Sequence, residues 1–334
     1  ETRDIRNGFG THHIAALQTA QVSGLTTKQI FWFDSAQVSA IKTQDLSNLT
    51  KSQVKGLSTL GIVGLSTEMV EAFTSSQISG ITTANLRVLN THHISAISTL
   101  AINKLLAKQI QFLTTNQFAS LSPEHISVLE TQQISSIETR DIGFGLTTSQ
   151  IVGFTTSQIK GLSTKQVFAL SSAQVNAIQT NDMSEMSNAQ IHSLSTSGIL
   201  GLTTENISIF YSTQIAGIKT KELNQLGTNQ ISAINTFAFR GLTTKQLVKL
   251  STNQVAAITT GQIKVLDTSQ IISFETKDIN LGFTTTQIKG LTTSQIRVLT
   301  TKQIFSLDFF QVNAIETEDL RKMSTEQIKS LNTK

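Results

Sequence analysis

The sequence predicts an all-α solenoid, in which very short helices, one in each eight-residue repeat, coil around a continuous core. Three observations lead to this prediction. An octad recurs from Leu17 to Asn332, each octad contains a pair of helix-capping residues, and its apolar spacing suits neither a long helix nor a strand. A short-rung β-solenoid is the alternative architecture.

Six of the eight positions of the octad are restricted to one or a few residue types. Leu, Ile or Phe stands at position 1, Ser or Thr at 2, Thr at 3, Gln at 5, Ile, Val or Leu at 6, and a small residue at 8, as in LTTSQIVG from Leu146. Two nine-residue versions interrupt the series, IETRDIGFG from Ile137 and FETKDINLG from Phe274. Such an unbroken period indicates a repeat protein.

A period of eight excludes a single continuous element. Along one α-helix, eight residues turn through about 800°, so that an apolar stripe would drift by about 80° in each octad. In a strand, positions 1 and 6 would point to opposite faces. We therefore expect one short helix in each octad, with the apolar residues at positions 1 and 6 buried and positions 4 and 7 facing solvent.

Two N-cap assignments are compatible with the octad. With position 2 as N-cap, Gln at position 5 falls at N3 and completes a capping box, and positions 1 and 6 form a hydrophobic staple. With position 3 as N-cap, the near-constant Thr is explained directly. Pro123 stands at position 3, and because Pro favours N1, it supports the first assignment. A ladder of Gln amides between successive octads is a further expected role of position 5.

Composition excludes several classes of protein. Charged residues are only 14% of the 334 residues, against roughly 25% in ordinary soluble domains. The chain has one Pro and many Leu and Ile residues, which is not typical of disorder. It has no Cys, which excludes disulfides and thiolate metal sites. No apolar run approaches the roughly 18 residues of a membrane span.

Departures from the consensus recur at a second period of 137 residues. Gly61 and Gly198 both replace the position-5 Gln, as do Ala101 and Ala238. We therefore treat residues 1–334 as one continuous array with super-repeats at 1–137, 138–274 and, in part, 275–334. No polar capping repeat closes either end, so we expect an excerpt of a longer array or ends covered by further copies.

Acids or Asn replace Gln at position 5 in a patterned series, which we interpret as structural marks of the super-repeat. Their spacing would fit about 5.7 octads in each superhelical turn, with the marks aligned along one side. These marks are Asp4, Asp45, Asn85, Asp141, Asp182, Glu222, Asp278 and Asp319.

No residue pattern predicts catalysis, a cofactor or a metal site. The pairs His12–His13 and His92–His93 are adjacent rather than four residues apart, so we interpret them as polar substitutes for the x-Gln dipeptide. Lys residues at position 7 could line up along a phosphate backbone, but 26 basic residues face 22 acids, and one Trp and one Tyr offer little base stacking. We therefore expect no nucleic-acid partner.

The hexapeptides LTTKQI, LTTSQI, LSTKQV and IETRDI resemble a known kind of sequence. They are similar to the LTTxQIxxL octapeptide arrays of giant bacterial secreted or surface proteins, which are often RTX-like or adhesin-like. The resemblance implies an extracellular or cell-surface location and a role as spacer, stalk or fibre. It assigns no functional residue.

Two functional hypotheses follow. The first is a structural, non-catalytic rod, stalk or fibre, whose partners are further copies of itself or adjoining repeats. The alternative is an adhesin or binding module that contacts a glycan, host protein or polyanion through the variable positions 4 and 7.

Overall fold

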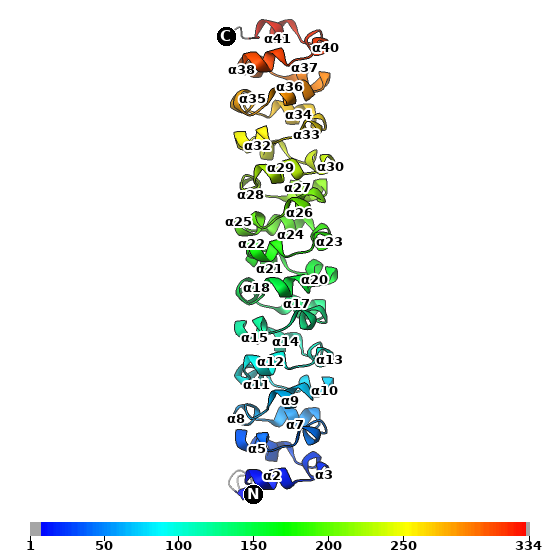
Figure 1. Cartoon of the computed structure of the whole chain (residues 1–334), viewed down its shortest axis with the longest axis vertical. Coiled ribbons are helices and arrows are strands. Elements are labelled where there is room, and N and C mark those ends of the chain that lie inside the picture. Colours follow the sequence, from blue (N-terminus) through cyan, green and yellow to red (C-terminus); the bar gives the residue numbers. More distant parts are fainter. Residues whose placement is uncertain (1–7, 332–334) are drawn as a thin grey trace. The chain divides into compact units, whose positions relative to one another are not determined.

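The chain folds into short α-helices joined by brief extended segments, as the octad predicts. The computed structural model describes residues 8–331, which contain 40 helices and no strand (Figure 1). The all-α solenoid is therefore confirmed, and the described residues give no support to a β-solenoid. Each helix has only four to six residues.

The helices belong to two compact units, which are described separately. The first unit is Glu1–Ala169. Its described helices are α2 (Thr11–Ala16), α3 (Thr19–Ser23), α4 (Thr27–Phe31), α5 (Ser35–Ser39), α6 (Thr43–Leu46), α7 (Lys51–Gly56), α8 (Thr59–Ile62), α9 (Thr67–Glu71), α10 (Ser75–Ile78), α11 (Thr83–Val88), α12 (Thr91–Ser95), α13 (Thr99–Ile102), α14 (Ala107–Gln111), α15 (Thr115–Ala119), α16 (Pro123–Ser127), α17 (Thr131–Ser136), α18 (Thr139–Phe144), α19 (Thr148–Val152), α20 (Thr156–Gly161) and α21 (Thr164–Ala169).

The second unit is Leu170–Lys334. Its described helices are α22 (Ser172–Asn176), α23 (Thr180–Ser184), α24 (Asn188–Ser193), α25 (Thr196–Leu200), α26 (Thr204–Ser208), α27 (Ser212–Gly217), α28 (Thr220–Leu223), α29 (Thr228–Ala233), α30 (Thr236–Phe239), α31 (Thr244–Leu247), α32 (Thr252–Ala256), α33 (Thr260–Lys264), α34 (Thr268–Ile272), α35 (Thr276–Leu281), α36 (Thr285–Gly290), α37 (Thr293–Val298), α38 (Thr301–Ser306), α39 (Phe309–Asn313), α40 (Thr317–Leu320) and α41 (Thr325–Lys329).

Position 2 is the N-cap, and position 3 is the first helical residue. Thr26, for example, has an extended backbone, and its hydroxyl accepts a hydrogen bond from the backbone N–H of Gln29, three residues later. Pro123 stands at N1 of α16, behind the N-cap Ser122. The first of the two cap assignments is therefore confirmed.

Burial follows the octad register in both units. Apolar residues at positions 1 and 6, such as Leu49 and Val54, are almost completely buried in one octad after another. Within each unit, helices pack on the helix three octads further along, as α4 packs on α7 and α24 on α27. Because a helix of four to six residues is unstable alone, these buried faces and the contacts between turns must stabilise it.

The small residue at position 8 permits a close approach between turns rather than a special backbone conformation. No glycine in the described residues has a positive φ. A Cβ added to Gly64 would overlap the backbone carbonyl of Ser35, and one added to Gly201 would overlap that of Ser172. The helix of the preceding turn thus restricts the size of the side chain at position 8.

Replacing Gly64 by Ala tests this restriction. We expect Gly64→Ala to destabilise the fold by about 1–3 kcal/mol, because the added methyl group forces the backbone of Ser35 to move. Urea unfolding followed by circular dichroism measures the change. Gly261→Ala is the control, since the nearest atom to its Cβ is 3.5 Å away and the substitution should be neutral or slightly stabilising. Equal effects of the two substitutions would contradict the interpretation.

Candidate functional site

Within each unit, Gln side chains at position 5 join one turn of the coil to the turn before it. The Oε1 atom of Gln77 accepts a hydrogen bond of 2.8 Å from the backbone N–H of the N-cap Thr74, which closes the capping box. Its Nε2 atom donates to the carbonyl oxygens of Leu46 and Leu49, both at 2.8 Å. The side chain of Gln77 is only 2% exposed.

The accepting carbonyls belong to Leu46, the last residue of α6, and to Leu49, which follows that helix. The carbonyl of Leu46 also accepts from the backbone N–H of Leu49. Carbonyls at and beyond a helix end lack i+4 partners within the helix. One Gln therefore satisfies a donor at the start of its own helix and acceptors at the end of another. The same arrangement recurs in both units, for example at Gln166 and Gln254.

These bonds correct two predictions. The expected ladder of amides between successive octads is wrong, because the amide groups donate to backbone carbonyls 28 to 32 residues earlier. The expected 5.7 octads in each turn is also wrong. The Gln side chain lies over the carbonyl 28 residues earlier, so one turn takes about three and a half octads.

Other residues at position 5 reproduce part of the Gln geometry. In His125, Nδ1 accepts from the backbone N–H of Ser122 at 3.0 Å, and Nε2 lies 2.7 Å from the carbonyl of Ile97. Because a carbonyl only accepts, Nε2 carries the proton. Asn85 donates from Nδ2 to the carbonyl of Leu57 at 2.8 Å. His125 therefore takes the place of Gln at position 5.

Acids at position 5 use a different partner, a Thr hydroxyl at the first helical position of the preceding turn. Thr19 donates to Asp45 at 2.5 Å, and Thr115 donates to Asp141 at 2.6 Å. In these octads the N-cap residue, Lys42 or Glu138, makes no side-chain cap bond. The corresponding pairs in the second unit are Thr196–Glu222 at 3.4 Å, Thr252–Asp278 at 3.4 Å and Thr293–Asp319 at 2.7 Å.

The structure buries the predicted marks but does not align them. Asp45, Asn85, Asp141, Asp182, Glu222, Asp278 and Asp319 are each at most 8% exposed, and Asp4 lies outside the described residues. Asn85 and Asp141 are seven octads apart, which is two turns, so they share a side. Asp45 is five octads before Asn85, about half a turn out of line, so the expected single line of marks is wrong.

One of these carboxylates, Asp278, has surroundings that oppose its ionisation. Burial is the first cause that raises the pKa of Asp278, and the negative charge of nearby Glu275 raises it further, against the opposing effects of Thr252 and Lys277. The Oε2 atom of Glu222 is buried without a hydrogen-bond partner among the described residues. The described residues contain no group of three or more His, Cys, Asp or Glu side chains arranged to hold a metal ion.

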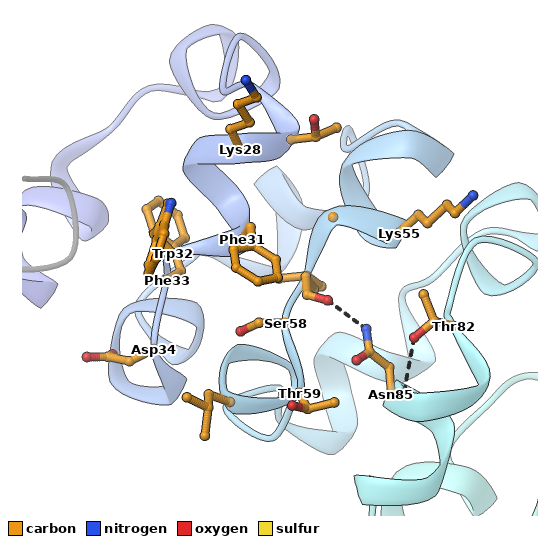
Figure 2. A pocket seen from close by; sticks show the side chains of 14 residues that line it. Lys28, Phe31, Trp32, Phe33, Asp34, Lys55, Ser58, Thr59, Thr82 and Asn85 are labelled. Atoms are coloured by element: carbon orange, nitrogen blue, oxygen red, sulfur yellow. Dashed lines mark hydrogen bonds between the residues drawn. The ribbon is translucent and has the colours of Figure 1, made fainter. Parts of the chain in front are cut away.

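A groove crosses three turns of the first unit and combines aromatic rings with basic side chains. It has a volume of about 630 Å³ and is lined by Lys28 and Phe31 of α4, by Trp32, by Lys55 of α7 and by Leu60 of α8. Figure 2 shows the ring of Phe31 between the two lysines, with Asn85 of α11 at the far edge. Phe31 is 51% exposed. The rings of Phe31 and Trp32 contact each other edge to face, with their centroids 5.6 Å apart.

A second groove continues from α11 along the first unit. It is lined by Arg87 of α11, by Phe112 after α14, by Glu138, the N-cap of α18, and by Arg140 of α18. Arg140 also lies 3.5 Å from the carboxylate of Asp141. In Figure 1, α8, α11 and α18 follow one another along the same side of this unit.

The second unit contains two grooves with equivalent residues. One is lined by Glu275, the N-cap of α35, and by Lys277 of α35, which stand 137 residues after Glu138 and Arg140. The other is lined by Lys302 and Phe305 of α38, which stand twice 137 residues after Lys28 and Phe31. Sequence reasoning had assigned positions 4 and 7 to solvent. The 137-residue recurrence of Phe31, Phe168 and Phe305 was the signal that could have revealed a repeated surface feature.

Removing the amide of a buried position-5 Gln should destabilise the fold much more than removing the amide of an exposed Gln. Gln77→Met leaves the carbonyl of Leu49 without its partner and offers the N–H of Thr74 only a weak sulfur acceptor, at about 1–3 kcal/mol for each unsatisfied group. The carbonyl of Leu46 keeps its bond from the backbone N–H of Leu49. We expect a loss of several kcal/mol in urea unfolding. Gln44→Met, at an exposed position 4, is the matched control and should change little. A similar response at both positions would contradict the bridging role.

Asp278→Asn should stabilise the protein at neutral pH. The folded-state pKa of Asp278 is raised above its ordinary value of 3.8, so between these two pKa values the folded state binds more protons than the unfolded state. The stability of the wild-type protein therefore falls as the pH rises from 3.8 through the folded-state pKa. The variant lacks this fall, so its advantage should disappear at acid pH. Thermal unfolding across a pH series measures it. Glu275→Gln should move the interval to lower pH, and an unchanged pH profile in both variants would contradict this account.

No helix among the described residues is both long and apolar enough to cross a membrane. A comparison with curated proteins finds no match. A crystal structure of the leucine-rich repeat-containing protein LegL7 from Legionella pneumophila aligns with 69% of this chain and 78% of its own at 10% identity, but a TM-score of 0.19 carries no argument. The ALTTAQ repeat family matches residues 134–172, 175–209, 238–268 and 271–308. The chain is therefore a repeat protein with segments similar to ALTTAQ repeats.

Proposed function

We propose that the chain is a structural, non-catalytic repeat array that forms part of a rod, stalk or fibre. One observation carries the proposal: the same Gln contact joins each turn to the turn before it. An array of this kind gains length by adding octads, without any new type of contact, and its stability grows with each neighbouring interface.

The distribution of polar groups supports a structural role over catalysis. A catalytic site needs a unique group of mutually placed residues. The buried carboxylates of this chain are instead distributed over the array, and Asp45, Asp141 and Asp319 each hold a short hydrogen bond from a Thr hydroxyl. This repeated pairing is what a structural substitution for Gln requires.

We place this array at the bacterial cell surface or in the extracellular matrix. The resemblance of its octads to those of large secreted and surface proteins supports that location, and a sequence without Cys is compatible with it. Its structural partners in this proposal are adjoining repeats or further copies of itself.

A binding module is the second candidate function, and the grooves specifically favour it. Positions 4 and 7 contribute no buried side chain to the core of these octads, yet they place Lys28, Phe31 and Lys55 around one groove. A surface ligand that uses positions 4 and 7 would make the array an adhesin as well as a spacer.

Electron microscopy of the full chain tests the structural proposal. We expect rods of uniform width, because every turn repeats the same contacts, and small-angle scattering should give a profile typical of an elongated particle. Lengthening the chain with additional octads should lengthen the rods in proportion. A compact globular particle in solution would overturn the proposal.

Location is tested separately on intact cells. Antibodies against the folded array should label unpermeabilised cells or the surrounding matrix, and external protease should remove the signal. Labelling that requires permeabilisation would contradict the surface location and leave the rod proposal untouched.

A further inference from the structure

Basic side chains follow one side of the first unit at about one for each turn. Lys28 of α4 and Lys55 of α7 line one groove, and Arg87 of α11 and Arg140 of α18 line the next. Lys165 of α21, which packs on α18, extends the series. We call this side of the first unit, together with Phe31, Trp32, Phe112 and Phe168, the basic–aromatic face.

Acidic side chains are scarce on the basic–aromatic face. The acids that line its two grooves are Asp34, which is half-buried, and Glu138, which is exposed. Other exposed acids of the unit lie on different helices, with Glu68 and Glu71 on α9 and Glu124 on α16. The face therefore has a net positive charge, which is complementary to an anionic partner.

The spacing of the charges indicates which anion the face fits. Helices packed on one another lie roughly 8–10 Å apart, so one cation in each turn gives a sparse line of charges. Duplex DNA carries one charge for about every 1.7 Å of its axis, a much denser line. A polysaccharide with a carboxylate on every second sugar has a sparse line of charges comparable to that of the face.

The exposed aromatic rings also favour a sugar-containing ligand. Phe31 is 51% and Phe168 is 57% exposed, and each stands three residues after a Lys in the same helix. A flat exposed ring can cover the apolar face of a sugar, while the hydroxyl groups of Thr59 and Thr82 in the first groove can bond its hydroxyls. Single-stranded nucleic acid would instead require rings for successive bases.

The Lys–Phe pair recurs although folding does not require it. Lys28–Phe31, Lys165–Phe168 and Lys302–Phe305 are 137 residues apart, and all three Phe side chains are more than half exposed. In the first groove, Phe31 and Trp32 contact each other, and contiguous exposed apolar patches mark interaction sites. The recurrence indicates that the pair is retained for a surface contact.

We propose that the basic–aromatic face binds a linear acidic polysaccharide that carries one carboxylate in each disaccharide. The lysines and arginines pair with the carboxylates, and the Phe and Trp rings pack on the intervening sugars. This inference rests on the binding-module candidate and does not depend on the rod proposal.

The full chain provides its own reporter, because its single Trp, Trp32, lines the first groove. We expect hyaluronate, which has one carboxylate in each disaccharide, to change the Trp fluorescence at low salt in a saturable way. A neutral chito-oligosaccharide of similar length and oligothymidylate should bind more weakly.

Matched substitutions separate the face from general charge. Lys28→Glu with Lys55→Glu should weaken hyaluronate binding by at least about tenfold, equivalent to about 1.4 kcal/mol. Lys264→Glu with Lys289→Glu makes the same charge change on α33 and α36, which pack on each other outside the face. That control pair should retain most of the affinity.

A second matched pair tests the aromatic contact. Phe31→Ser should weaken binding, whereas Phe237→Ser, which removes a ring that is 61% exposed on α30, should not. Circular dichroism confirms that each variant is folded, and calorimetry replaces fluorescence where Trp32 is itself perturbed.

Three results would overturn the inference. They are a lack of hyaluronate binding by the wild-type chain, equal weakening by the two charge variants, or tighter binding of oligothymidylate. In each case, rods in electron micrographs of the same preparation would leave the structural proposal standing. Rods without binding and binding without rods are therefore distinguishable outcomes.

Discussion

The two-ended hydrogen bonding of the position-5 Gln is the interaction on which the rest of this fold depends. A helix of four to six residues consists almost entirely of ends, so most of its N–H and C=O groups lack an intrahelical partner. Gln166 satisfies the N–H of Ser163 at the start of its own helix and the carbonyls of Ile134 and Ile137 in the preceding turn. Burial of positions 1 and 6 then makes these bonds strong and costly to lose.

The residues that replace Gln show which part of this interaction the fold can lose. His125 keeps both the acceptor and the donor, whereas Asn85 keeps the donor to the preceding turn. Asp45 keeps neither, and its helix is held instead by a hydroxyl from Thr19. A long array tolerates such local losses because each turn contacts only its neighbours, so that a weaker turn does not propagate its defect.

Local structure could be predicted from the sequence because its causes lie within one octad. Pro123 identified N1, and the spacing of positions 1 and 6 identified the core. The size of the turn could not be predicted, since it depends on how helices from different octads pack. The assumption that Asp45, Asn85 and Asp141 are aligned gave 5.7 octads, whereas the Gln bonds give about three and a half. The sequence pattern singled out the marks but did not predict their burial, and the Thr partners of the acids lie 26 residues away and have no local signal.

The size of the turn also gives the 137-residue super-repeat a physical meaning. Seventeen octads at about three and a half octads in each turn make about five turns, so a substitution repeated at this interval returns to nearly the same side of one unit. Phe31 and Phe168 of the first unit fulfil this condition, and both lie at position 7, where the core sets no requirement. A sequence that repeated only the octad pattern would keep the core residues, and its surface residues could vary from octad to octad. A sequence that repeats after a whole number of turns also places the same surface residues on the same side of the coil. We infer that the surface as well as the core has shaped this sequence.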